Sequence, residues 1–260
     1  MARAALLKHL RGAAWTFAAM IALAGCQSHP RSEPRKTAAS RPAPASAPYQ
    51  AETEEGLGAA VAILVDTSGS MRDKAPGDSR AKFDVAQEAL AQMLDATDAF
   101  IARRPDFPIK IGLYSFSSNV RRLQPIQPYN REVMRAGLAN LPRPGGGTAI
   151  GDAMREARPD LYRAGVFRKY FLVVTDGENT RGREPDAVAR EIWRKSEGGV
   201  QTFFVAFDTS PEKFGFLKEV GGDVIGAGTG PDLRKALDDI YKGKILAEAI
   251  DAGEKEPVKK

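Results

Sequence analysis

The stretch VAILVDTSGSMRD, Val61 to Asp73, indicates which fold this chain adopts. Its first half is a continuous run of apolar residues, which is typical of a strand buried on both faces of a parallel sheet. Its second half places three oxygen-bearing side chains, Asp66, Ser68 and Ser70, at alternate positions directly after that strand. The stretch therefore predicts a polar site at the end of a buried strand.

Strand-like and helix-like patterns alternate along the residues that follow. Further strands are expected in FPIKIGLYSFS, NVRRLQPI, KYFLVVTD, VQTFFVAFD and GDVIGAG. Helices are expected in the segment that begins near Phe83, and in NREVMRAGLANL, AIGDAMREARPDLYRAG, REPDAVAREIWRKSEG, PEKFGFLKEVG and PDLRKALDDIYKGKILAEAI. Pro159 is expected to kink or end its helix. This alternation predicts a doubly wound α/β fold, with a mostly parallel sheet and helices on both faces.

A second strand also ends in a carboxylate, because KYFLVVTD finishes at Asp176. In doubly wound sheets, ligands bind beyond the carboxyl ends of the strands, where the strand order reverses. If the strands that end in Asp66 and Asp176 are neighbours there, the two carboxylates meet. The glycine-rich loop PGGGT brings Thr148 within reach. Two carboxylates and three hydroxyls form the ligand set of a hard divalent cation.

Three segments, DTSGSM, GGGTAIGDAM and TDGEN, together resemble the metal-ion-dependent adhesion site of the von Willebrand factor A domain. The resemblance covers about residues 58–245 and implies the Rossmann-like fold of that family. It also implies a bound Mg²⁺ or Mn²⁺, held directly by the serine and threonine hydroxyls and through water by the aspartates. The metal residues would then be Asp66, Ser68, Ser70, Thr148 and Asp176. A protein partner would complete the coordination with an acidic side chain.

A purely structural interpretation competes with the metal site. In it, the same residues form turns and helix caps, with Thr148 as the N-cap of the helix that follows. That interpretation leaves the two strand-end aspartates unexplained, because unpaired carboxylates side by side favour protonation or cation binding.

Two other functions stay open, a Mg²⁺-dependent hydrolase that uses Asp66 or Asp176, and a scaffold in which the metal only fixes loops. The hydrolase would need a further nucleophile or general base. The two histidines, His9 and His29, and the one cysteine all precede the domain, which excludes histidine-assisted nucleophilic catalysis and zinc–thiolate sites. The sequence therefore predicts a binding module with no catalytic residues and no enzyme activity.

The N-terminal residues have the order of an exported lipoprotein. Residues 1–25 join a basic start to an apolar run that is short for a membrane span, as in a secretory signal. Leu23-Ala24-Gly25-Cys26 resembles the bacterial lipobox, in which the cysteine carries the lipid. Residues 26–57 are rich in Pro, Ala and Ser, which predicts a flexible tether before a domain at 58–250 and a disordered tail at 251–260.

Charge and the residue after the cysteine bear on location and partners. Gln27 stands where an aspartate would favour the inner membrane, so the predicted location is the outer membrane, facing the periplasm.

Residues 1–50 hold seven of the 38 basic residues and one of the 33 acidic residues. The remainder is close to neutral, which argues against a nucleic-acid partner. Arg72, Lys74 and Arg80 follow the metal motif, either as a solvated rim or as a surface for an acidic partner. The oligomeric state is left open.

Overall fold

The computed structural model describes residues 55–247. The predicted signal at 1–25, the lipidated Cys26, nearly all of the tether and the tail at 251–260 lie outside these residues. The first strand begins at Gly56, two residues before the expected start of the domain. Within the described range, no helix combines the length and apolar character that crossing a membrane requires.

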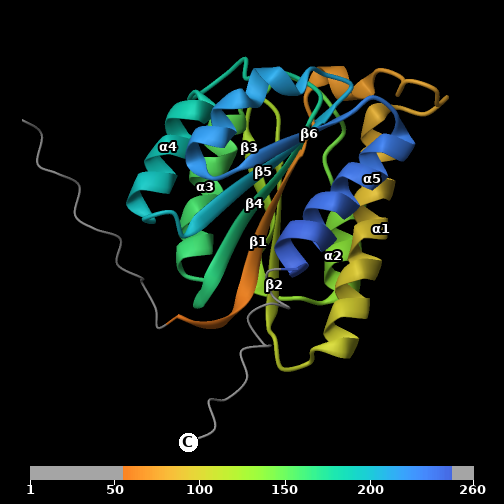
Figure 1. Cartoon of the computed structure of the whole chain (residues 1–260). Coiled ribbons are helices and arrows are strands. Elements are labelled where there is room, and N and C mark those ends of the chain that lie inside the picture. Colours follow the sequence, from red (N-terminus) through yellow and green to blue (C-terminus); the bar gives the residue numbers. More distant parts are fainter. Residues whose placement is uncertain (1–54, 248–260) are drawn as a thin grey trace, which may run out of the picture. The chain divides into compact units, whose positions relative to one another are not determined.

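Six strands in this part of the chain form one sheet in the order β3-β2-β1-β4-β5-β6 (Figure 1). Only β3 is antiparallel to its neighbour, and the other pairs are parallel. The predicted fold class is therefore confirmed. The strands are β1 (Gly56–Asp66), β2 (Ile109–Phe116), β3 (Val120–Pro128), β4 (Val166–Thr175), β5 (Val200–Phe207) and β6 (Asp223–Ala227).

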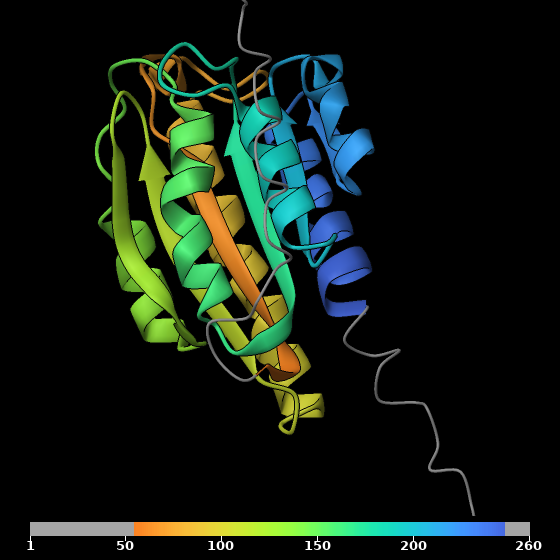
Figure 2. The ribbon, with the colours of Figure 1, turned by 90° about the vertical axis from the view of Figure 1, so that its left-hand side faces the viewer.

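Helices cover both faces of the sheet (Figures 1 and 2). One face packs against α1, α2 and α5, and the other packs against α3, α4 and η2. The helical elements are η1 (Gly69–Arg72), α1 (Lys82–Arg103), α2 (Arg131–Ala139), α3 (Ile150–Tyr162), α4 (Pro185–Lys195), η2 (Pro211–Val220), α5 (Gly230–Ile240) and η3 (Tyr241–Leu246).

The central strand β1 supplies both apolar cores. Val61, Ile63 and Val65 belong to the core on one face, and the alternate residues, Ala62 and Leu64 among them, belong to the core on the other. All of them are at most 1% exposed. The unbroken apolar run therefore follows from burial on both faces, because successive side chains of a strand point to opposite sides.

Two helices differ from their expected course. Pro159 does not end α3, which continues to Tyr162 with Leu161 fully buried in the core. The predicted last helix consists of α5 and a π-helix, η3. Tyr241 lies at their junction, where its buried hydroxyl is 2.7 Å from the hydroxyl of Thr97 on α1. Burial of their side chains holds both segments in place, and the spacing of apolar residues in the sequence does not by itself predict this.

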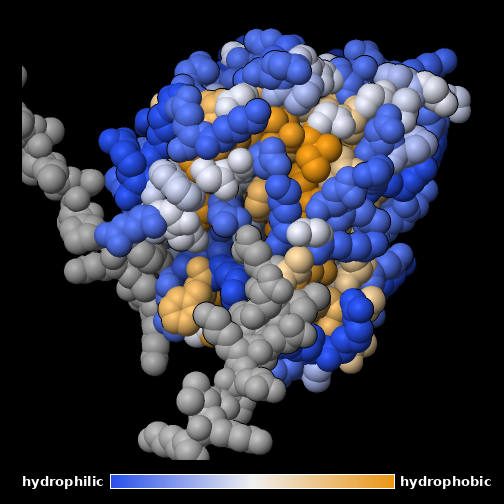
Figure 3. All heavy atoms as spheres, in the orientation of Figure 1, coloured by the Kyte–Doolittle hydropathy of each residue, from blue (hydrophilic) through white to orange (hydrophobic). Residues whose placement is uncertain are grey.

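The edge strand β6 leaves apolar surface open on the face shown in Figure 3. Within β6, Val224 and Ile225 are only partly buried. The strand is five residues long, and its first residue, Asp223, pairs with Lys244 at 2.7 Å. A short edge that carries charge limits pairing with the edges of other sheets.

Candidate metal centre

The two aspartates of the predicted site follow neighbouring strands. β1 ends at Asp66, and Asp176 comes directly after Thr175, the last residue of β4. These strands pair in parallel, and the strand order reverses between them, because β1 is flanked by β2 on its other side and β4 by β5. Both carboxylates therefore lie at the sheet end where the carboxyl termini of the strands meet, at the top of Figure 2.

A continuous chain of hydrogen bonds joins four of the predicted residues. The backbone N–H of Ser68 donates to Asp66 Oδ1 at 2.7 Å. The hydroxyls of Ser68 and Ser70 lie 3.1 Å apart, and the Ser70 hydroxyl donates to Asp176 Oδ1 at 2.7 Å. Because the Ser70 hydroxyl donates its hydrogen to Asp176, its oxygen keeps lone-pair density that can bind a cation.

The glycine loop that carries Thr148 lies against the Asp-x-Ser-x-Ser loop. Gly145 donates its N–H to the carbonyl of Thr67 at 2.8 Å, and Gly69 donates to the carbonyl of Gly146 at 3.0 Å. Gly146 has a φ of +81°, and a Cβ there would lie 2.7 Å from the hydroxyl oxygen of Ser118. This position requires glycine, and the close approach brings the loop that carries the fifth predicted residue, Thr148, against the loop of the serines, with Thr148 only 5% exposed.

Thr148 does not cap α3, so that part of the competing interpretation is wrong. Ala149 occupies the N-cap position without a side-chain bond, and the N–H of Ile150 donates to Asn179 Oδ1 at 2.9 Å. The backbone of Thr148 is held by the same loop, because its N–H donates to Thr180 Oγ1 at 2.8 Å and its carbonyl accepts from the N–H of Arg181. The segment after Asp176 therefore positions Thr148 and leaves its hydroxyl free of a capping role.

Lys82 and Asp208 join this cluster, and sequence reasoning missed both. Lys82 Nζ lies 3.1 Å from Asp176 Oδ2 and 2.8 Å from Asp208 Oδ2. Asp208 directly follows β5, so three neighbouring strands end in aspartate, and the motif VQTFFVAFD carried that signal. Lys82 gave no signal, because a lysine in the first turn of a helix usually faces solvent.

The carboxylates are not unpaired, which corrects the electrostatic argument from the sequence. Asp176 is bound by Ser70 and Lys82, while Asp66 Oδ2 accepts the hydroxyl proton of Thr175 at 2.6 Å. Burial nevertheless raises the pKa of Asp66 to about 6, against the hydrogen bonds from Thr175 and Ser68. Burial pulls the pKa of Lys82 down, but its hydrogen bonds to Asp208 and Asp176 outweigh burial and hold it above its usual value.

The donor set fits a hard divalent cation. Three carboxylates and one ammonium leave this cluster with two negative charges when Asp66 is ionised, which one divalent ion would neutralise. In residues 55–247, no group of three or more His, Cys, Asp or Glu side chains is arranged to hold a metal. A metal centre here therefore depends on the hydroxyls of Ser68, Ser70 and Thr148.

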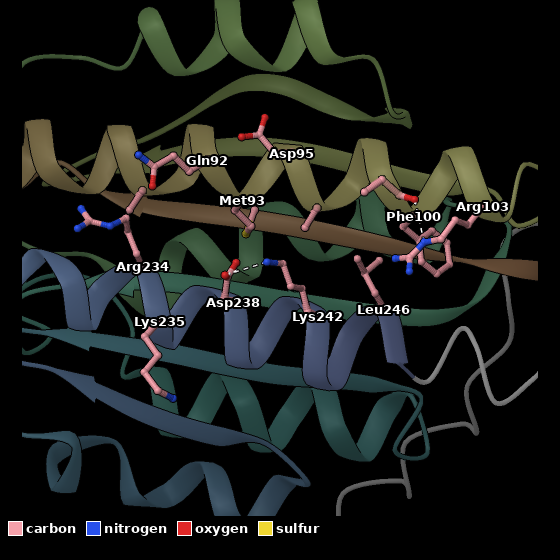
Figure 4. Close-up of a pocket in the computed structure, with 13 residues that line it drawn as sticks. Gln92, Met93, Asp95, Phe100, Arg103, Arg234, Lys235, Asp238, Lys242 and Leu246 are labelled. Atoms are coloured by element: carbon pink, nitrogen blue, oxygen red, sulfur yellow. Dashed lines mark hydrogen bonds and ion pairs between the residues drawn. The ribbon is translucent and has the colours of Figure 1, made fainter.

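A groove of about 720 Å³ lies elsewhere, between α1 and the C-terminal helices (Figure 4). Met93 and Phe100 line it, and an ion pair between Asp238 and Lys242 crosses its side at 2.8 Å. The groove shares no lining residue with the candidate centre. The case for the metal site therefore rests on its donor atoms and does not depend on a cavity.

Comparisons with known proteins bear on the family and the fold. The family model described as the von Willebrand factor type A domain matches residues 61–178. The chain is similar to YwmC, an uncharacterised protein of Bacillus subtilis (strain 168), with 27% identity over 210 residues, covering 74% of this chain and 87% of YwmC.

Solved structures share the fold at low identity. The PilB minor pilin of Streptococcus sanguinis aligns with a TM-score of 0.61 and 18% identity, over 77% of this chain and 64% of the pilin. The alignment thus spans less than two thirds of that pilin. Proximal thread matrix protein 1 of the mussel byssus, solved with a zinc-occupied MIDAS motif, aligns with a TM-score of 0.55 and 18% identity, over 71% of this chain and 47% of that protein. Residues 61–178 thus match the model of the von Willebrand factor type A domain, and the six-stranded sheet has the fold of these solved structures.

Proposed function

We propose that this chain is an exported, lipid-anchored binding module that engages a protein partner through one divalent cation. The observation that carries the proposal is the convergence of three chain segments, around Asp66, Thr148 and Asp176, into one hydrogen-bonded cluster of hard oxygen donors. Von Willebrand factor type A domains generally mediate protein–protein interaction and are generally not enzymes.

The residues divide into two roles in this proposal. The hydroxyls of Ser68, Ser70 and Thr148 would hold the cation directly, while Asp66 and Asp176 orient its waters. With few anionic ligands, the ion would keep the electrophilic character that attracts a carboxylate of the partner. The zinc in the mussel protein supports a divalent cation, and oxygen donors alone favour Mg²⁺ or Mn²⁺.

Two arginines beside the centre favour an acidic partner. Arg72 Nε lies 3.4 Å from the carbonyl of Gly69, between the two serines of the motif, and the backbone of Arg181 holds Thr148. Both side chains are exposed. Arg80, in contrast, is engaged by Asp78 and Glu88, so it adds little to the attraction.

The hydrolase alternative finds no support in the described residues. Lys82 contacts Asp176 directly, and two ion pairs hold it. No histidine occurs after His29. Asp208 is the carboxylate of the cluster that lies outside the predicted metal set, and its ion pair with Lys82 makes it a poor general base.

A crosslinking pull-down from envelope extracts tests the function. The full chain should capture a partner in Mg²⁺ and release it in chelator, and Thr148→Ala should capture markedly less. Equal capture with and without Mg²⁺ would instead favour the scaffold, in which the metal only fixes loops. Hydrolysis of generic phosphate esters that disappears in Asp66→Ala would favour the hydrolase.

The anchor gives a separate prediction. Cys26→Ser should move the protein from the membrane fraction to the soluble fraction or leave its precursor unprocessed, because the lipid would have no attachment atom. Fractionation followed by mass spectrometry of the mature N-terminus measures this. The anchor is refuted if Cys26→Ser fractionates like the wild type and the mature N-terminus lies at another residue.

Charge at the rim gives another prediction. The double variant Arg72→Gln, Arg181→Gln should recover about tenfold less partner at low salt, with a smaller difference at high salt, because exposed charges act mainly by steering association. Arg234→Gln, on the distant α5, is the matched control and should bind normally. A loss that does not depend on salt would argue against the electrostatic role.

A further inference from the structure

We infer that Lys82 is a positioning residue that acts as an internal counter-cation of the metal centre, and this inference rests on the proposed function. Lys82 is the first residue of α1, and its side chain is 8% exposed. Its ammonium group contacts Asp176, whose side chain is fully buried. Charges in such a position are poorly screened by salt, so Lys82 acts strongly on any cation bound nearby.

Lys82 and the cation would share one carboxylate. Asp176 Oδ1 accepts the Ser70 hydroxyl, and Oδ2 contacts Lys82 Nζ. Both carboxylate oxygens thus have partners without any metal, which keeps Asp176 in position in the metal-free domain. The same ammonium repels a divalent ion held on Ser70 and thereby lowers the affinity of the centre.

Asp208 is the second carboxylate partner of Lys82. It lies 0.3 Å closer to Lys82 Nζ than Asp176 does, at 2.8 Å against 3.1 Å. Its backbone has a φ of 53°, which among residues other than glycine is adopted mainly by Asn and Asp, and its N–H donates to the carbonyl of Ala227 at 2.7 Å. Backbone conformations of this kind persist where surrounding contacts impose them, here with the carboxylate aimed at Lys82.

The account predicts opposite effects for the two partners. Lys82→Met removes the repulsive charge and should tighten Mn²⁺ binding about tenfold, while lowering the unfolding temperature in chelator, since Asp176 and Asp208 lose their cation. Asp208→Asn should weaken Mn²⁺ binding about tenfold, because the cluster loses one negative charge and Asp176 is left as the charged partner of Lys82. The double variant restores the net charge of the cluster and should bind Mn²⁺ about as tightly as the wild type.

Calorimetric titration of the full chain and these variants with Mn²⁺ is the test, with unfolding in chelator as the second readout. Asparagine tolerates a positive φ, so Asp208→Asn gives an answer even if Lys82→Met does not fold, and Lys82→Gln is a second replacement. If both Lys82 variants bind Mn²⁺ no more tightly than the wild type, or if Asp208→Asn binds it more tightly, the counter-cation role is wrong. A wild type that binds no Mn²⁺ would instead overturn the proposed function itself.

Discussion

Asp66→Asn is expected to weaken Mg²⁺ and Mn²⁺ binding about 100-fold or more while leaving the fold intact, because a charge that orients the metal's waters is lost. The fold can accept the amide. Asp66 Oδ1 accepts from Ser68, a role that the amide oxygen can keep. The amide N–H₂ would face Thr175, whose hydroxyl can turn to donate to the carbonyl of Gly177 at 3.2 Å.

The same variant should stabilise the metal-free domain at neutral pH. Asp66 has a pKa of about 6 in the fold against a usual value of 3.8, so the folded state favours the protonated form. The stability tied to protonation is complete below about pH 4 and is lost as the pH rises through about 6. Asparagine keeps this stability at every pH. We therefore expect Asp66→Asn to unfold with about 1–3 kcal/mol more free energy than the wild type at pH 7.5 in chelator, and to match it near pH 4.

Urea unfolding at several pH values, together with calorimetry, measures both effects. Asp106→Asn is a suitable control, because Asp106 is 71% exposed and its contact with Arg104 is long, at 3.7 Å. This control should change neither metal affinity nor the pH profile. Metal binding by Asp66→Asn at wild-type strength would show that Asp66 has no part in the centre.

Gly151→Ala is expected to destabilise the domain by about 2–3 kcal/mol and to weaken metal binding as well. A Cβ at Gly151 would lie 2.2 Å from the carbonyl oxygen of Arg183, so α3 and the loop after Asp176 would have to separate. That loop holds Thr148 through Thr180 and the start of α3, at Ile150, through Asn179. Gly151→Ala should therefore lower both the stability of the domain and its affinity for the metal.

Gly215→Ala is the matched control for that substitution. Gly215 also lies in a helical segment, η2, but a Cβ there would meet nothing within 4 Å. Denaturant unfolding should separate the two variants clearly. If Gly151→Ala is as stable as Gly215→Ala, the close approach of α3 to the loop does not support the centre.

Much of this architecture could be predicted from the sequence, because it depends on local patterns. The run that became β1 and the second halves of those that became β4 and β5 are apolar, since these stretches are buried on both faces. Their parallel arrangement then brings Asp66 and Asp176 to one end of the sheet. The glycines before Thr148 indicated a loop that approaches closely, and Gly146 adopts the positive φ that such a loop needs.

The rest depends on contacts that local patterns do not encode. Lys82 reaches a carboxylate 94 residues away in the sequence, although its position in a helix predicts a solvated side chain. Asn179 caps a helix that begins 29 residues earlier, a role that the competing structural interpretation gave to Thr148. The π-helix after Ile240 continues an apolar pattern that reads as an ordinary α-helix. Tertiary packing decided each of these features.

The central claim is that Ser68, Ser70 and Thr148 hold one divalent cation beside Asp66 and Asp176. Anomalous diffraction from crystals of the Cys26→Ser chain grown with Mn²⁺ locates the ion directly. We predict a single strong peak among the three hydroxyl oxygens, absent in Asp66→Asn crystals grown in the same way. Wild-type-like crystals with no manganese at these hydroxyls, or with manganese bound only elsewhere, would contradict the account.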